Sequence, residues 1–292
     1  ITFTNKAANE MKRRLYDFKA GAAYMHISTI HSFCATVLRQ EAASFDRNSN
    51  FTIYAEDEKK SVVKKIVKEC FEDSDAKVVD GFCDSISDIK NKAPELLDGD
   101  LAALAKTDEY LDNELSRLQS LTETNDNAEV IKIIETYGKK MAENNALDFD
   151  DLLYYVYKLF VNSEQILEKY RERYKYILID EFQDTNKVQY KIFKMLGEKY
   201  RNIFVVGDDD QSIYGWRGAD AHNLKKFEAD FPDCQLFKLE QNYRSTKSIL
   251  DVANDVISRN TGRFDKVLWT ENEQGIKPQL YTAYNESDEA YY

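Results

Sequence analysis

Two adjacent carboxylates, Asp180 and Glu181, follow an apolar run from Tyr176 to Ile179 that is typical of a buried strand. In open α/β sheets, ligands bind at the carboxyl ends of the strands, which is where this pair would lie. An Asp there can hold Mg²⁺ directly or through water, and a neighbouring Glu can orient or deprotonate the water that attacks a γ-phosphate. The alternative is structural: the two carboxylates cap the helix that follows.

A second polar cluster follows the apolar run that ends at Val206. Gly207 is succeeded by the aspartates of residues 208–210 and by Gln211. If the two strands are parallel, both clusters lie at the same edge of the sheet, and Gln211 comes near the metal and the γ-phosphate. Its amide can donate to a phosphate oxygen and accept from water. A calcium loop is the alternative, but the alternating oxygen ligands and distal Glu of an EF-hand are absent from this sequence.

Two aromatic residues and a guanidinium come next, in the run SIYGWRGA. Tyr214, Trp216 and Arg217 lie among glycines that free the backbone. Such a segment offers a surface on which bases of any sequence can stack. The alternative is that both rings fill a core. The glycines and the adjacent Arg217 favour an interaction with DNA.

The elements that must position these residues follow from the spacing of apolar side chains. Helices are expected at residues 5–21, around residues 37–38, and at residues 188–196 and 246–257. Strands are expected at residues 176–179, 203–206 and 235–239. Strands that alternate with helices indicate a parallel sheet covered on both faces. The sequence therefore predicts an α/β fold.

The sequence changes character between about residues 46 and 146. Apolar residues recur there at intervals of three and four, charges of both signs alternate, and strand-like runs vanish. We therefore expect an all-helical insert. The predicted organisation is one α/β domain built from residues 1–46 and 147–240, a helical insert at 47–146, and the start of a second domain at 241–292.

Composition restricts the class of protein. A chain of 292 residues with 43% hydrophobic and 32% charged residues is long enough for two or three packing units. The net charge of −12 argues against nucleic acid only on average, since a local basic or aromatic track suffices for binding. The longest apolar runs are far shorter than the roughly 20 residues of a membrane span. We expect a soluble protein.

The cysteines and the chain ends complete this description. The four cysteines form no CxxC pair, which fits a reducing cytoplasm. His31 and Cys34 are spaced like metal ligands, but even with His26 a zinc shell of four ligands is incomplete. The chain opens at Ile1 on a strand-like alternation and stops in mid-pattern at Tyr292, so we expect both ends to be truncated.

Six segments together resemble one family. They are ITFTNKAANEM, TIHSF, LDFDDLL, ILIDEFQDTN, VVGDDDQSIYGWRGA and LEQNYRST, and they run in the order of the motifs of the superfamily 1A DNA helicases of the UvrD, PcrA and Rep group. The resemblance covers residues 1 to about 288. It implies a RecA-like parallel sheet of the P-loop NTPase type with an inserted helical subdomain. It also implies an ATP-dependent helicase that moves 3′ to 5′ on single-stranded DNA.

The resemblance assigns roles at the nucleotide. It implies that Asp180 is the Mg²⁺ ligand and Glu181 the catalytic base, and that Gln211 senses the γ-phosphate of ATP. Tyr243 matches the residue that stacks on adenine. Arg244 matches an arginine finger, a device that contributes roughly 10³ to 10⁵ in rate. The alternative for Arg244 is an ordinary surface ion pair.

The resemblance also assigns residues to DNA. Those that match the family's base-stacking aromatics are Phe3, Tyr214 and Trp216. Those at positions that contact or place the strand are Thr4, Asn5, His31 and Arg217. The implied partners are single-stranded DNA, single/double-strand junctions, and repair or replication proteins in the cytoplasm.

One expected feature is absent from the sequence. A phosphate loop reads GxxxxGK, and the only Gly-Lys step, Gly138 to Lys139, has Ile133 where the first glycine belongs. We expect that loop upstream of Ile1, and we expect this chain alone to bind ATP poorly and to unwind nothing. Two other classes remain open: a non-catalytic DNA-binding or interaction protein with a degenerate motor, and the helicase subunit of a helicase-nuclease complex.

Overall fold

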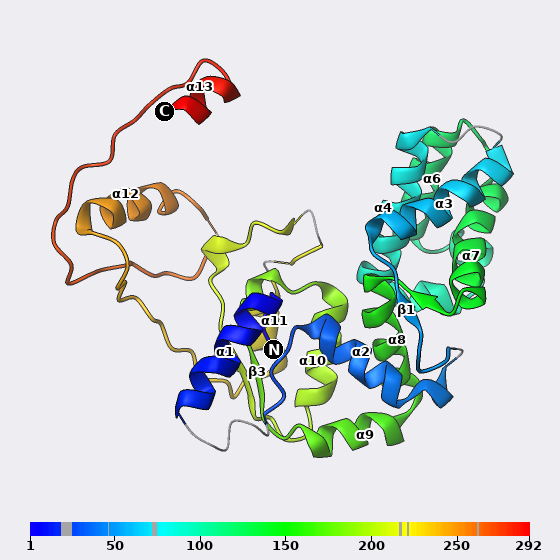
Figure 1. The fold of residues 1–292 in the computed structure, drawn as a ribbon, viewed down its shortest axis with the longest axis horizontal. Coiled ribbons are helices and arrows are strands. Elements are labelled where there is room, and N and C mark those ends of the chain that lie inside the picture. Colours follow the sequence, from blue (N-terminus) through cyan, green and yellow to red (C-terminus); the bar gives the residue numbers. More distant parts are fainter. Residues whose placement is uncertain (19–24, 46, 72–74, 216–217, 221, 262) are drawn as a thin grey trace. The chain divides into compact units, whose positions relative to one another are not determined.

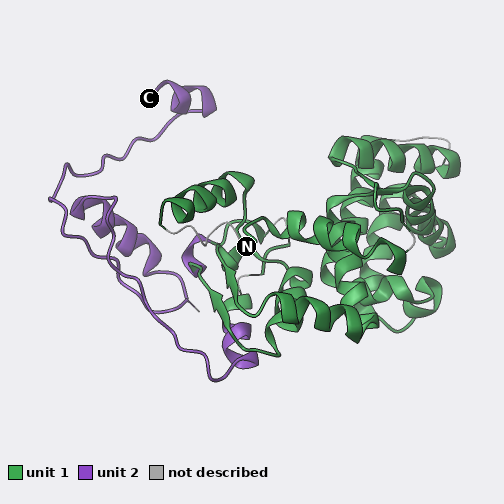
Figure 2. Ribbon diagram, turned by 60° about the horizontal axis from the view of Figure 1, so that its bottom comes forward, with its two compact units in different colours: residues 1–208, 212–224 green, residues 209–211, 225–292 purple. Residues whose placement is uncertain are grey.

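A computed structural model describes residues 1–18, 25–45, 47–71, 75–215, 218–220, 222–261 and 263–292. The described residues form a mixed α/β structure with two small parallel sheets (Figure 1). They divide into two compact units, residues 1–208 with 212–224 and residues 209–211 with 225–292 (Figure 2). The predictions for Trp216 and Arg217 fall outside the described residues. Within those residues, every helix is too short or too polar to cross a bilayer.

The elements of the chain follow in order. The α-helices are α1 (Asn5–Phe18), α2 (Ile30–Gln40), α3 (Glu56–Phe71), α4 (Ala76–Lys92), α5 (Leu101–Leu104), α6 (Glu109–Thr122), α7 (Asn127–Glu143), α8 (Phe149–Asn162), α9 (Glu164–Arg173), α10 (Lys187–Gly197), α11 (Asn223–Asp230), α12 (Lys247–Ile257) and α13 (Glu286–Tyr291). The strands are β1 (Thr52–Ile53), β2 (Ala146–Leu147), β3 (Ile177–Ile179) and β4 (Ile203–Val205). Short 3₁₀ turns are η2 (Ala42–Ser44), η3 (Pro94–Asp98), η4 (Phe182–Asp184) and η5 (Asp209–Gln211).

The sheet around β3 is parallel, as the sequence predicts. β3 pairs with β4 along its whole length. On the other edge of β3, the nitrogen of Ile1 donates to the carbonyl of Leu178 at 2.8 Å, and the nitrogen of Asp180 donates to the carbonyl of Ile1 at 3.0 Å. Thr2 forms a further parallel bridge with Thr29. Extended segments that are distant in sequence therefore meet beside the Asp180–Glu181 pair.

Local predictions from the sequence hold in most places. The helices expected at residues 5–21, 37–38, 188–196 and 246–257 correspond to α1, α2, α10 and α12, and the first two predicted strands correspond to β3 and β4. The strand predicted at residues 235–239 is wrong. That segment has no regular structure, and Leu239 is 85% exposed. A strand needs a partner strand. In the described part of the second unit, the β-bridge that forms joins Gln241 to Trp269, beyond the predicted strand.

The expectation of a sheet covered on both faces is also wrong for the described residues. Ile177 and Ile179 are buried, but Leu178 and its partner Phe204 point to the opposite face and are 61% and 57% exposed. Successive side chains of a strand point to opposite faces, so this pattern means that one face is packed and the other is open. Both strands are apolar at every position, so their sequences do not distinguish the packed face from the open face.

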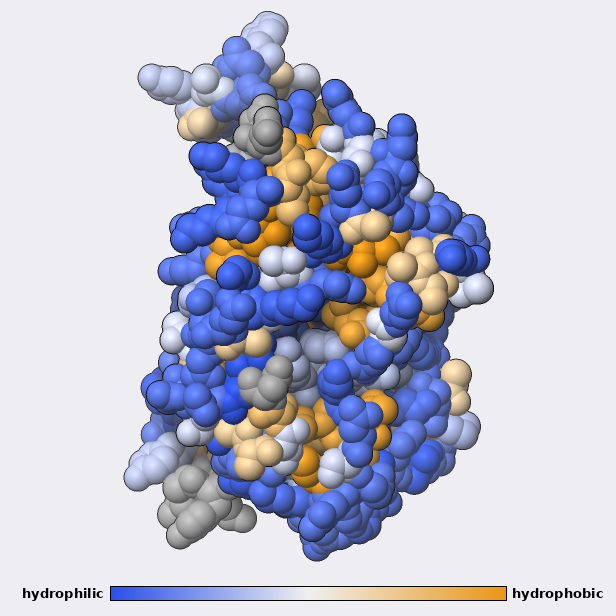
Figure 3. Space-filling model, turned by 90° about the vertical axis from the view of Figure 1, so that its right-hand side faces the viewer, coloured by the Kyte–Doolittle hydropathy of each residue, from blue (hydrophilic) through white to orange (hydrophobic). Residues whose placement is uncertain are grey.

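The helices between β1 and β2 share a hydrophobic core of their own. Residues from α3, α4, α6 and α7 meet in it, with Val63, Phe82, Leu111 and Ile133 fully buried. These helices lie together as one group (Figure 1), and on the face shown in Figure 3 hydrophilic side chains surround patches of apolar ones. The expected insert is therefore helical in its core. It is not all-helical, because β1 pairs in parallel with β2.

The second unit is built around α12. Asn254, on α12, donates from its side chain to the carbonyl of Leu268 at 2.8 Å and accepts from the nitrogen of Leu268 at 3.1 Å. At the start of the helix, the nitrogen of Ser248 donates to the carbonyl of Gln274 at 2.9 Å. Gly275 follows with φ of 71°, a left-handed conformation that glycine adopts without steric cost. The extended segment after α12 is therefore attached at both ends of the helix.

Candidate functional site

The carboxylates of Asp180 and Glu181 lie at the carboxyl end of β3, as predicted. The hydroxyl of Thr2 donates to Oδ2 of Asp180 at 3.2 Å, so the neighbouring extended segment fixes one carboxylate. Glu181 has φ of 53°, which places a residue with a side chain in the left-handed region. Such a conformation costs of order 1–3 kcal/mol and tends to be kept at functional sites. The Glu181 side chain is exposed at this turn.

Gln183 holds this turn, and the sequence analysis did not single it out. Its side chain is 1% exposed, and its Nε2 donates to Oε2 of Glu181 at 2.9 Å. Its Oε1 accepts from the backbone nitrogen of Asp208 at 3.0 Å. A Cβ on Gly207 would lie 2.9 Å from Oε1 of Gln183, so a glycine is needed for this close approach. The sequence feature that could have identified Gln183 is an amide side chain two residues after Glu181.

Asp184 is a third carboxylate in the segment after β3. Its Oδ1 is buried and has no hydrogen-bond partner among the residues that the structure describes. Burial raises the pKa of Asp184, and the charge of Glu181 raises it further. Hard cations such as Mg²⁺ take oxygen ligands and keep several waters. Carboxylates suit such an ion, but among the described residues the group of three whose ligand atoms lie within 4.8 Å of one another is Asp208, Asp209 and Asp210, after β4.

The acidic run after β4 binds cations of the protein itself. Arg263 donates to both oxygens of Asp210, at 2.8 and 2.6 Å, and Nζ of Lys266 lies 2.7 Å from Asp209. The hydrogen bond from Arg263 lowers the pKa of Asp210. These pairs give no support to a calcium loop at this position. Gln211 follows directly with an exposed side chain, and its approach to a metal and a γ-phosphate stays a prediction.

Tyr243 and Arg244 lie in a turn before α12, in the second unit. The side chain of Asn242 accepts from the backbone nitrogens of Arg244 at 3.0 Å and Ser245 at 2.8 Å, which shapes the turn. Tyr243 is 79% exposed, and its hydroxyl donates to Gln241 at 2.7 Å. Arg244 is exposed and forms no ion pair among the described residues. An exposed ring and an exposed guanidinium are both free to meet a ligand.

Phe3 and Tyr214, which both match base-stacking residues, lie against each other. Their ring centroids are 5.2 Å apart at an interplanar angle of 28°. Phe3 is 38% exposed and Tyr214 is partly exposed, so neither ring is sealed in a core. Thr4 has a structural role, since its hydroxyl accepts from the nitrogen of Ala7 at the start of α1. Asn5 is exposed beside it.

His31 contacts a further aromatic residue that the sequence analysis left without a role. It meets Phe149 edge-on, with centroids 5.7 Å apart, and Phe149 is 50% exposed. Burial lowers the pKa of His31, although the charge of Asp150 acts in the other direction. The imidazole is therefore neutral at pH 7. An exposed aromatic side chain beside a neutral imidazole is suited to contact a base.

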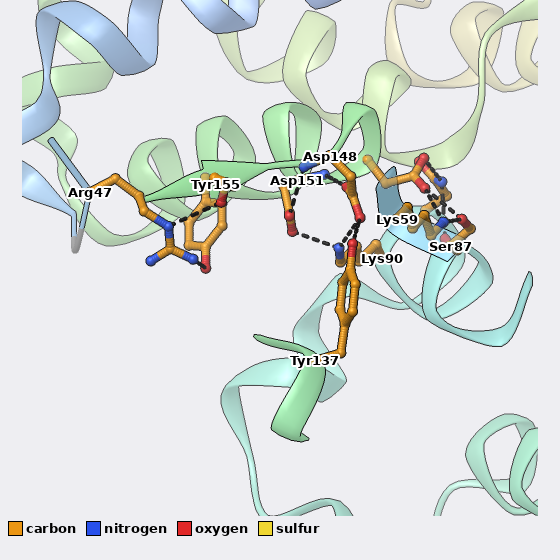
Figure 4. Close-up of polar contacts among 11 residues, drawn as sticks. Arg47, Lys59, Ser87, Lys90, Tyr137, Asp148, Asp151 and Tyr155 are labelled. Atoms are coloured by element: carbon orange, nitrogen blue, oxygen red, sulfur yellow. Dashed lines mark hydrogen bonds and ion pairs between the residues drawn. The ribbon is translucent and has the colours of Figure 1, made fainter. Parts of the chain in front are cut away.

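Behind Phe149, the start of α8 carries a box of buried carboxylates (Figure 4). Asp148 caps the helix and accepts from the hydroxyl of Tyr137 at 2.7 Å. Lys90, on α4, lies between Asp148 and Asp151, at 2.8 and 2.7 Å from their oxygens. Lys90 and both carboxylates have side chains no more than 7% exposed. This box joins α4 to α8 by ion pairs and α7 to α8 by a hydrogen bond.

Gly138 and Lys139, the one Gly-Lys step, lie inside α7. A phosphate loop needs a run of backbone nitrogens that is free to face an anion, and the interior of a helix has none. The structure thus agrees with the sequence that this step is no phosphate loop.

Comparisons with known proteins match the whole chain. The family model of the UvrD/REP helicase N-terminal domain matches residues 1–232, and that of the UvrD-like helicase C-terminal domain matches residues 237–292. An ATP-dependent DNA helicase PcrA of Staphylococcus epidermidis is 42% identical over 295 residues, which is 100% of this chain and 38% of that protein. An ATP-dependent DNA helicase PcrA of Staphylococcus aureus is 42% identical over 293 residues, 99% of this chain and 37% of that protein. The chain spans little more than a third of the length of these relatives.

Proposed function

The chain belongs to the UvrD/REP helicase family, and on this basis we propose that it is the ATP-hydrolysing and DNA-stacking part of a 3′ to 5′ DNA helicase. In this proposal, residues 1–46 and 147–240 are a RecA-like domain, 47–146 are its helical insert, and 241–292 begin a second RecA-like domain. The observation that carries it is the strained Glu181 turn at the carboxyl end of β3, beside a parallel β4.

The carboxylates after β3 would hold the metal and the attacking water. Asp180 would bind Mg²⁺ directly or through a water. When bound, the ion neutralises charge on the phosphates of ATP. Glu181 orients the attacking water and accepts its proton, and Gln183 supports it by holding Oε2 in one place. The exposed side chain of Glu181 in the left-handed turn supports this role.

Three further residues would complete the nucleotide site. Gln211 senses the γ-phosphate, Tyr243 stacks on adenine, and Arg244 acts as an arginine finger on the γ-phosphate. The exposed side chains of Tyr243 and Arg244 support these roles. A finger in such a site contributes roughly 10³ to 10⁵ in rate.

The DNA strand would pass over the stacked rings. Phe3 and Tyr214, with Trp216, stack on bases, while those that place the strand are Thr4, Asn5, His31 and Arg217. The contact between Phe3 and Tyr214 supports this assignment. Single-stranded DNA and single/double-strand junctions are the proposed ligands. Repair or replication in the cytoplasm is the proposed setting.

The substitution Glu181→Gln in the full-length protein tests this proposal. It keeps the shape of the side chain but removes the base, so DNA-stimulated ATP hydrolysis should fall by about 10² to 10⁴. Affinity for single-stranded DNA should stay within twofold, because no stacking residue changes. ATP turnover and DNA fluorescence anisotropy measure the two quantities. Glu135→Gln, at an exposed position on α7, is the matched control and should change neither.

Two outcomes would contradict the assignments. Unchanged turnover in Glu181→Gln would remove Glu181 from its role as base. DNA binding without any ATP turnover in the unaltered full-length protein would favour the non-catalytic alternative over the helicase.

A further inference from the structure

Thr185 and Asn186 form a buried junction directly after the Glu181 turn. Both are 6% exposed. The hydroxyl and the nitrogen of Thr185 donate to the carbonyl of Phe182, at 2.7 and 3.2 Å, which closes the turn. Asn186 caps α10, where its Oδ1 accepts from the nitrogen of Gln189 at 2.9 Å. The Nδ2 of Asn186 is then available for a contact outside its own segment.

One arm of the junction runs into the helical region. Nδ2 of Asn186 donates to Oδ1 of Asn91, on α4, at 2.8 Å. Nδ2 of Asn91 donates in turn to Oδ1 of Asp150 at 2.7 Å. The other oxygen of Asp150 accepts from Ser87 at 2.6 Å, and Lys59 contacts it as well (Figure 4). This arm therefore ends next to Phe149, the ring that meets His31.

A second arm reaches the aromatic segment. Asn186 forms an antiparallel bridge with Ala219, and the nitrogen of Ala219 donates to the carbonyl of Tyr214 at 3.3 Å. Asn223, which is 1% exposed, donates from Nδ2 to the carbonyl of Thr185 at 2.8 Å. This arm ends at the backbone of Tyr214, whose ring stacks on Phe3. The first arm thus ends beside the ring that contacts His31, and the second ends at the backbone of Tyr214; His31 and Tyr214 are both assigned to DNA.

We propose that Asn91, through Asn186, and Asn223, through Thr185, are positioning residues that couple DNA binding to the Glu181 turn. The inference rests on the proposed helicase function and goes beyond it, because neither residue lies among those assigned to ATP or DNA. A displacement of Phe149 or Tyr214 by a bound strand moves the partners of Thr185 and Asn186. These two residues are joined to the turn that sets the direction of Glu181.

The chemistry of the amides is the reason to expect the junction to move as one piece. A buried donor or acceptor that loses its partner costs about 1–3 kcal/mol, so Asn91, Asn186 and Asn223 keep their bonds when the backbone shifts. An apolar contact has no such preference for one arrangement. Coupling between two sites typically changes a property by about 5- to 150-fold, which is the range expected for stimulation by DNA.

Reversing one hydrogen bond tests the coupling in the full-length protein. Asn91→Asp keeps the acceptor for Asn186 but loses the donor to Asp150 and places two carboxylates together. We expect stimulation of ATP hydrolysis by single-stranded DNA to fall about tenfold. The basal rate and the KM for ATP should stay within twofold. Adding Asp150→Asn restores a donor and an acceptor in the opposite direction, and stimulation should recover by at least half.

Asn202→Asp is the matched control, because the Asn202 amide donates to the carbonyl of Lys175 at 3.1 Å at an exposed position. It should leave stimulation unchanged. If Asn91→Asp does not fold by circular dichroism, Asn223→Ser is measured in the same way, since it shortens the side chain that donates to Thr185. A tenfold loss of stimulation at an unchanged basal rate supports the coupling there too.

The outcomes separate the inference from the proposed function. No stimulation in the unaltered protein overturns the helicase proposal itself. Normal stimulation in Asn91→Asp, or in Asn223→Ser, overturns the coupling alone. A parallel loss of basal and stimulated rates that Asp150→Asn does not reverse assigns Asn91 a purely structural role, which also overturns it.

Discussion

Removal of the Lys90 ammonium, by Lys90→Met, is the perturbation whose magnitude the structure fixes best. The Lys90 side chain is 7% exposed, and its Nζ lies 2.8 Å from Asp148 and 2.7 Å from Asp151. Methionine has a similar length and no charge. The variant therefore leaves two buried carboxylates close together without their cation.

Breaking a buried pair by removing one partner costs about 3–5 kcal/mol. Lys60→Met is the matched control on α3, since Lys60 lies 2.9 Å from Asp80 with both side chains about half exposed. An exposed pair of this kind contributes about 0–1 kcal/mol. At roughly 1.4 kcal/mol for each factor of ten, Lys90→Met should open α4 and α8 about a hundred- to several-thousand-fold more often.

Amide hydrogen exchange of α4 and α8 measures this opening segment by segment.

Burial and the charge of Asp148 raise the pKa of Asp151 to about 6. The folded state then binds a proton more tightly than the unfolded state between about pH 4 and 6, so this group favours folding as the pH falls through 6. Without Lys90 the pKa of Asp151 rises further.

Lys90→Met should therefore lose less exchange protection, relative to the unaltered chain, at pH 5 than at pH 7. Intrinsic exchange rates are corrected for pH in this comparison. Equal protection of α4 and α8 in Lys90→Met and Lys60→Met would refute the account of a buried charge box. A loss of protection that stays constant or grows on acidification would refute the protonation assigned to Asp151.

Further predictions concern DNA stacking and two glycines. Tyr214→Ala should weaken binding of single-stranded DNA by about 1–3 kcal/mol in fluorescence anisotropy. Tyr176→Ala, at a ring that is 74% exposed just before β3, is the control and should leave the affinity unchanged. Equal affinities of the two variants would remove Tyr214 from the stacking surface. Gly275→Ala should destabilise the second unit, because its φ is 71° and a Cβ would lie 2.5 Å from the Thr246 hydroxyl. Gly138→Ala, with open space around it in α7, should instead stabilise the helical region by about 0.5–1 kcal/mol. Thermal unfolding followed by circular dichroism checks both, and the same sign for both would contradict the argument.

Local pattern was enough for much of the fold. The spacing of apolar residues predicted α1, α2, α10 and α12, because a helix is stabilised by neighbours three and four residues away. The apolar runs before Asp180 and Gly207 predicted β3 and β4. The same reasoning failed at residues 235–239, because a strand is completed only by a partner elsewhere in the chain.

The sequence by itself also determined which residues are candidates for chemistry. Asp180 and Glu181 are adjacent, so one strand end delivers both, and their types restrict what they can do. The family follows from the order of long motifs, which is likewise a property of the sequence.

Only the tertiary structure decided how those candidates are supported. Gln183 holds Glu181, Phe3 lies on Tyr214, and Asn91 meets Asn186 across 95 residues of sequence. Hydrogen bonds and ring contacts act over a few ångströms and in defined directions. They therefore depend on where the backbone brings distant segments together, and no spacing along the chain records that.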